Sequence, residues 1–85
     1  MYNYENERLK IYSEEGFEMF IKIRDEAKRL LDQAGAFRLD KVISKVAGES
    51  FMMLACIDNL VEQGKIKEVS QSGISTQHKI YTGRH

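Results

Sequence analysis

The sequence predicts an α+β fold in which three helices precede a two-stranded β-hairpin. Through residues 14–63, apolar residues recur every three or four positions, which is the spacing of a buried helical face. After Gly64 the pattern changes to short segments rich in Ile, Val, Tyr and Thr on either side of a glycine-containing turn, which is typical of a hairpin. The chain has 85 residues, of which 42 % are hydrophobic and 31 % charged, so it is expected to form one small globular domain.

Residues 1–12 precede this pattern and are expected to stand apart from the domain formed by residues 13–85. The segment reads MYNYENERLKIY, which is polar apart from its tyrosines and two aliphatic residues. It is either a loose N-terminal tail or a short helix that packs Leu9 and Ile11. We favour the tail, because chain termini are often loose unless other contacts hold them.

The first predicted helix covers residues 14–34. Ser13 can cap free N–H groups at its start, and the two acids that follow favour the positive end of the helix dipole. Its apolar stripe consists of Phe20, Ile23, Ala27, Leu30 and Ala34. Gly35 is expected to end the helix.

The second and third helices are predicted at residues 38–47 and 50–63, with a tight connection around Gly48. One face of the second helix is formed by Leu39, Val42, Ile43 and Val46. The third helix should be capped by Ser50 and end at Gly64, with a core stripe of Met53, Ile57 and Leu60.

The hairpin is predicted to have strands near residues 65–70 and 77–82, joined by a turn that contains Gly73. The preceding stretch CIDNLVEQGKIKEV is similar to a motif in which an apolar helix stops at a glycine and enters a strand. Ile57, Leu60, Gly64 and Ile66 occupy the positions of that motif.

On these residues the chain resembles the winged helix-turn-helix superfamily, as a small single-domain member, over about residues 16–84. The resemblance implies a nucleic-acid-binding protein with its third helix in the DNA major groove and its hairpin, the wing, on phosphate or in the minor groove. It implies double-stranded DNA as the partner and regulation of transcription as a role. With the bases of the wing and the second helix, it gives these nucleic-acid-binding candidates: Arg38, Lys41, Lys45, Ser50, Asn59, Lys65, Lys67, Lys79 and Arg84.

The composition of the third helix leads to an alternative. Residues 46–64 contain no Lys or Arg, but they include Glu49, Asp58 and Glu62. The helix is apolar nearly all round, so Phe51, Met52 and Leu54 are candidates for a protein interface. The alternative is therefore a protein-protein interaction module that does not bind nucleic acid, either as a homodimer or with another protein. The first helix and residues 1–12 would cover the same side chains if they belong to the core.

The sequence favours no catalytic, metal or cofactor site. Cys56 is the one cysteine, so it can form neither an internal disulfide nor a zinc site, and it indicates a reducing cytoplasm. Two histidines with no third ligand at suitable spacing do not predict a metal centre. We expect no enzyme activity, no small-molecule substrate and no membrane association.

Overall fold

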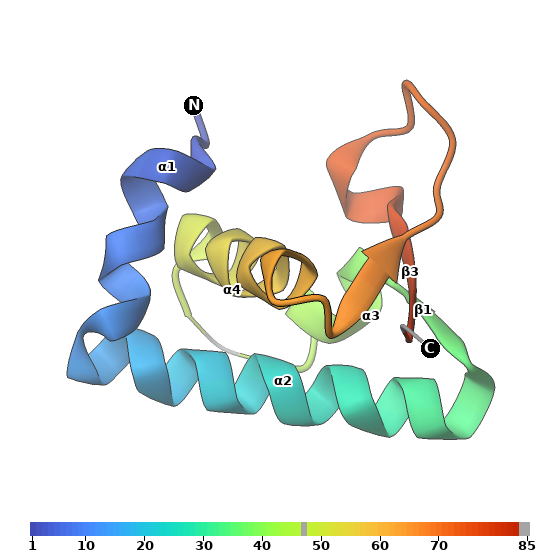
Figure 1. Cartoon of the computed structure of the whole chain (residues 1–85), viewed down its shortest axis with the longest axis horizontal. Coiled ribbons are helices and arrows are strands. Elements are labelled where there is room, and N and C mark those ends of the chain that lie inside the picture. The colour runs from blue at the N-terminus through green and yellow to red at the C-terminus, as the bar shows by residue number, and fades with distance from the viewer. Residues whose placement is uncertain (47, 84–85) are drawn as a thin grey trace.

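A computed structural model of the chain describes residues 1–46 and 48–83 (Figure 1). In chain order the helices are α1 (Tyr4–Glu7), the 3-10 helix η1 (Arg8–Tyr12), α2 (Glu14–Ala34), α3 (Leu39–Ile43), α4 (Ser50–Glu62) and the 3-10 helix η2 (Thr76–His78). The strands are β1 (Ala36–Arg38), β2 (Ile66–Glu68) and β3 (Ile80–Gly83). The protein therefore has a mixed α and β fold, as the sequence predicts.

The long helix α2 has the predicted bounds and the predicted caps. The Ser13 hydroxyl accepts a hydrogen bond of 3.0 Å from the N–H of Gly16, which satisfies one free donor at the helix start. At the other end Gly35 has a φ of 78°, and its N–H donates to the carbonyl of Leu31. A left-handed residue closes a helix in this way, and glycine adopts that conformation without strain.

The predicted helix 38–47 is wrong at both ends. Residues 36–38 form strand β1 instead, and α3 ends at Ile43. Arg38 is extended at the start of α3 and provides no side-chain cap, so the helix begins only where the strand has ended. Residues 44–46, 48 and 49 belong to neither helix, so the connection to α4 is longer than the tight turn expected from the sequence. Residue 47, where the predicted helix ends, lies outside the described residues.

Helix α4 matches its prediction, but its cap does not. The Glu49 carboxylate, and not the Ser50 hydroxyl, accepts a hydrogen bond of 2.7 Å from the N–H of Met52. At the C-terminal end Gln63 is the capping residue, and Gly64 follows with a φ of 74°. This left-handed glycine lets the chain turn from α4 into β2.

The sheet has three antiparallel strands in the order β1-β3-β2, so the predicted two-stranded hairpin is corrected to a hairpin plus a third strand. Tyr81 of β3 pairs with both Phe37 of β1 and Glu68 of β2, and the Phe37 and Tyr81 rings stack 5.4 Å apart on the buried face. Each outer strand pairs with β3 over three residues. Strand β2 therefore ends before the predicted residue 70. The second predicted strand, 77–82, begins late, because residues 77 and 78 belong to η2 and β3 starts at Ile80.

Residues 4–12 form helices packed against α2 and α4, which corrects the expected loose tail (Figure 1). Ile11 is 4 % exposed, as a packed helix requires, whereas Leu9 is 73 % exposed and does not contribute to the core. Gly16 allows this packing, since a Cβ atom there would collide with the carbonyl oxygen of Lys10. The N-terminal segment, residues 1–12, is therefore part of the domain.

The core lies between α2, α4 and the inner face of the sheet. Its fully buried side chains include Ile23, Leu39, Val42, Ile57 and Tyr81. In the described part of the chain, no helix has the length and apolar character needed to cross a membrane.

Candidate functional site

Helix α4 is enclosed on several sides, which determines what its surface can contact. In Figure 1 it lies above α2, with the N-terminal segment on one side and α3 and the sheet on the other. Met53, Ile57 and Leu60 are buried in the core, as predicted. Ala55 and Asn59 are also buried, although a helix of 3.6 residues per turn places them on the opposite side. The N-terminal segment covers that side.

Hydrogen bonds fix the N-terminal segment to α4. The Tyr2 hydroxyl donates to Asp58 Oδ2 at 2.6 Å, and Asn59 Nδ2 donates to the Tyr4 hydroxyl at 3.1 Å. The Tyr4 hydroxyl also donates to Glu62 Oε1 at 3.3 Å. Asn59 is 4 % exposed and engaged in this network, so its side chain does not lie at the surface where the predicted nucleic-acid contact would require it.

Burial also changes the acid-base properties of these groups. Desolvation raises the pKa of Asp58 above its ordinary value, and the hydrogen bond from Tyr2 opposes this shift. Desolvation likewise raises the pKa of Tyr2, and the neighbouring Asp58 carboxylate raises it further. Tyr2 therefore keeps its proton and remains a donor to Asp58.

The three interface candidates on α4 are largely covered within the single chain. Phe51, Met52 and Leu54 are each partly buried. Met52 and Leu54 pack against the core cluster, and the Tyr2 ring meets the Phe51 ring edge-on at 5.7 Å between centroids. Of the explanations that the sequence left open, cover by the chain itself accounts for most of this apolar surface.

The N-terminal end of α4 is poorly suited to phosphate. Free N–H groups at a helix start form a site for anions, but here the Glu49 carboxylate accepts from the Met52 N–H. Ser50 is exposed beside it and available for contact. The end of the helix that would enter a groove thus presents a carboxylate and no basic side chain.

Several of the predicted bases lie on or near the sheet, and two of them have acidic partners. Arg38 Nε is 2.8 Å from Asp40 Oδ1, and Lys79 Nζ is 3.6 Å from Glu68 Oε1. Lys67 is exposed and forms no ion pair with another described residue. Arg84 lies outside the described residues.

A small basic cluster surrounds Asp40. Its pKa is lowered first by the hydrogen bond from Arg38, with the charges of Lys41 and His78 acting in the same direction. Helix α3 packs against η2, which brings Lys41 and His78 to the same acid. Two of the predicted bases, Arg38 and Lys41, therefore lie together beside one carboxylate, with the His78 ring nearby.

Lys45 and Lys65 lie apart from each other, on different faces of α2. Lys45 lines a hollow with Glu26 and Arg29, whereas Lys65 lines a larger groove with Arg24 and Lys28. The predicted bases are therefore distributed around the molecule.

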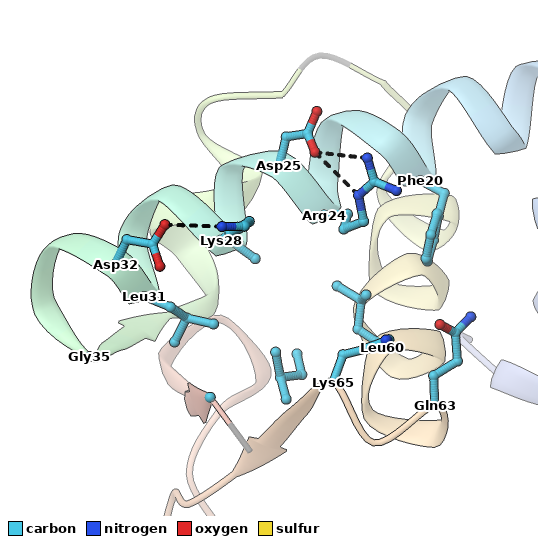
Figure 2. A pocket seen from close by; sticks show the side chains of 13 residues that line it. Phe20, Arg24, Asp25, Lys28, Leu31, Asp32, Gly35, Leu60, Gln63 and Lys65 are labelled. Carbon is cyan, nitrogen blue, oxygen red and sulfur yellow. Dashed lines mark hydrogen bonds and ion pairs between the residues drawn. The ribbon is translucent and has the colours of Figure 1, made fainter. Parts of the chain in front are cut away.

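The larger groove, which we call the α2 groove, was not predicted from the sequence. It has a volume of about 840 Å³ and runs between α2, the C-terminal end of α4 and β2 (Figure 2). Its lining is Phe20, Arg24, Asp25, Ala27, Lys28, Leu31, Asp32, Gly35, Leu60, Gln63, Lys65, Ile66 and Gly83. The apolar stripe of α2 was visible in the sequence, but nothing there indicated that α4 and β2 leave part of it uncovered.

The α2 groove combines an apolar floor with a charged rim. Ion pairs join Arg24 to Asp25 at 3.0 Å and Lys28 to Asp32 at 3.3 Å (Figure 2). Lys65, from the opposite wall, forms no ion pair with another described residue. The rim thus carries one more base than acid.

The other sites considered from the sequence have no reactive geometry. Cys56 is fully buried, and burial raises the pKa of its thiol to about 12, so the thiolate needed for nucleophilic attack does not form near neutral pH. Residues 1–46 and 48–83 contain no cluster of metal-binding side chains.

Comparison with protein-family models, with curated proteins and with solved structures gives no significant match to this chain.

Proposed function

We propose that this chain is a winged-helix domain that acts by binding protein and does not read DNA with α4. The winged-helix assignment is supported by the element order α2-β1-α3-α4-β2-β3 and by the strand order β1-β3-β2. In that architecture α4 corresponds to the groove-reading helix and the β2-β3 hairpin to the wing. Function depends on the site more than on the fold, so the surface of α4 decides between the two roles.

The observation that carries the proposal is which residues of α4 are buried and which are exposed. The side of α4 with Ala55 and Asn59 is buried beneath the N-terminal segment. The remaining partly exposed positions include Leu54 and Asp58, and the helix start is capped by Glu49. A surface without Lys or Arg cannot make the bidentate arginine contact to guanine and would place carboxylates against phosphate.

A salt titration with labelled random duplex DNA tests the claim that α4 does not read DNA. We expect no saturable binding at low salt up to about 100 µM protein, which is weaker than ordinary nonspecific binding. Saturable binding that weakens steeply as salt rises, and that a Ser50→Glu substitution at the exposed start of α4 abolishes, would overturn the proposal.

The claim that the chain acts by binding protein needs a measurement in the cell. Crosslinking in the native cells, followed by nuclease digestion and isolation of the tagged protein, should give protein complexes that survive the nuclease. Complexes that disappear on nuclease treatment would show that nucleic acid holds them together, and would contradict the proposal.

Contact with duplex DNA through the sheet and α3 is the second candidate function. It is favoured by the grouping of Arg38, Lys41 and His78 around one carboxylate, and by the exposed Lys67. If DNA binding is observed, a variant with Lys41→Glu and Lys67→Glu should flatten the dependence of log K on log salt by about one unit per lost phosphate contact. The matched control, Lys22→Glu with Arg29→Glu, changes the charge equally on exposed positions of α2. An equal loss in both variants would assign the effect to net charge.

A further inference from the structure

We infer that the α2 groove receives Phe17 from a second copy of this chain, in a symmetric dimer formed by antiparallel α2 helices. This inference deepens the proposed protein-binding function, because it names one protein partner and the surface that binds it. Two features of α2 support it, namely the exposed side chain of Phe17 and the apolar lining of the α2 groove.

The exposed side chain is Phe17, in the first turns of α2. It is 56 % exposed, although most of the other aromatic residues of the described chain are at least partly covered. The spacing from Phe17 to Phe20, Arg24 and Leu31 is three, seven and fourteen residues, so these four positions lie along one side of the helix. Phe17 therefore continues the line of the α2 groove beyond its end.

The hollow is displaced toward the other end of α2. Leu31 and Leu60 line it from facing helices (Figure 2). Ile66 of β2 also belongs to its lining. Its volume of about 840 Å³ is ample for a phenyl ring. The surface thus has an apolar projection and an apolar hollow separated along one helix.

Symmetry converts this separation into a self-complementary interface. At 1.5 Å per residue, Phe17 and Leu31 lie about 21 Å apart along the axis of α2. A two-fold axis passing near Arg24, midway between them, places Phe17 of each copy against Leu31 of the other. An interface of this kind uses the same patch on both partners, which is the commonest arrangement in soluble oligomers.

The charges fit the same arrangement. At the midpoint Arg24 is paired with Asp25 of its own chain, so the two-fold axis brings two neutralised pairs together and not two like charges. Around Phe17 the helix start carries Glu14, Glu15 and Glu18, whereas the α2 groove has an excess base in Lys65. Inserting Phe17 therefore brings an acidic helix end to the more basic rim.

The length of α2 also suits a specific interface. Its 21 residues span about 31 Å, comparable with the longest dimension of the molecule, 30 Å. Antiparallel pairing along this length extends over the longest dimension of the domain, and a standard interface buries roughly 800 Å² per partner.

Sedimentation equilibrium from about 1 µM to about 500 µM tests the dimer. We expect a concentration-dependent monomer–dimer equilibrium for the full chain, and a dissociation constant raised at least about tenfold by Phe17→Glu and by Leu31→Glu. Leu9→Glu is the matched control, since it introduces the same charge at an exposed apolar position outside the α2 groove and should leave the constant unchanged. Phe17→Ala provides a second variant without a new charge, and circular dichroism verifies that each variant is folded.

A mixture of the Phe17→Glu and Leu31→Lys chains tests the pairing itself. The mixed dimer retains one unaltered Phe17–Leu31 contact and pairs the two introduced opposite charges at the other, so it should form more readily than either variant dimer. A wild-type chain that is monomeric at the highest concentration would overturn the dimer, as would a dimer that all of these variants leave unchanged. Neither result bears on nuclease-resistant complexes with other proteins, so the dimer and the proposed function can fail separately.

Discussion

Asn59 shows how burial redirects a polar side chain. On sequence grounds it was a candidate for contact with bases, because asparagine can bond adenine in the major groove. In the fold its amide donates to the Tyr4 hydroxyl and accepts from Gln63, inside the contact between α4 and the N-terminal segment. Its contribution is therefore to stability.

Replacing Asn59 with alanine should lower the free energy of unfolding by about 1–3 kcal/mol, because it removes a buried side chain that bonds the partly buried Tyr4 hydroxyl and the Gln63 amide. Urea denaturation monitored by circular dichroism measures the change. Ser50→Ala, at an exposed position of the same helix, should change stability by less than about 0.5 kcal/mol. Equal effects of the two substitutions would show that Asn59 is not buried as described.

Asp58 should make stability depend on pH in a defined direction. Because burial raises its pKa, the folded chain holds a proton that the unfolded chain has released over a range of mildly acidic pH. The contribution of Asp58 is thus complete below its ordinary pKa and is lost as the pH rises through the raised value. Asp58→Asn does not titrate and retains an acceptor for Tyr2, so its stability relative to wild type should increase from about pH 3.5 to about pH 7. Denaturation curves at both pH values measure this difference, and a difference that does not change with pH would contradict the raised pKa.

Among the elements, the junction of η1 and α2 depends on Gly16. A methyl group at this position would meet the backbone of Lys10 and Ile11, which cannot move aside as a flexible side chain can. Gly16→Ala should therefore destabilise the fold by about 1–3 kcal/mol, although alanine is the better helix former. Thermal unfolding measures the loss, with Glu15→Ala as an exposed control on the same turn. A stabilising Gly16→Ala substitution would mean that η1 does not pack on α2 as found.

The elements also show what the sequence can predict. Helices α2 and α4 were predicted closely because their evidence is local, namely apolar spacing and glycines at the ends. Strand β1 was missed because it has three residues, and its partner, β3, lies more than forty positions further along the chain. The N-terminal helices were expected to be a tail because their stabilising contacts, such as Tyr2 with Asp58, join residues 56 positions apart in the sequence.

At the scale of the whole molecule, enclosure of α4 links the fold to the proposed function. The predicted bases are distributed over separate surfaces because α2 divides Lys45 from Lys65, a separation that sequence positions do not reveal. The apolar residues predicted for an interface are covered by the chain itself, and the large hydrophobic side chain that α2 exposes is Phe17, beside the α2 groove. The residue types of an interaction surface were thus visible in the sequence, but its location depended on how the elements pack.

The proposed function requires the N-terminal segment to cover α4. Nuclear Overhauser spectroscopy of the full chain in solution measures this contact directly. We predict cross-peaks between the ring protons of Tyr2 and Phe51, whose centroids lie 5.7 Å apart, and between the Tyr4 ring and the side-chain amide of Asn59. Residues 4–12 should also show helical chemical shifts. Random-coil shifts for residues 1–12, with no cross-peaks to α4, would leave the face with Ala55 and Asn59 open and contradict the account.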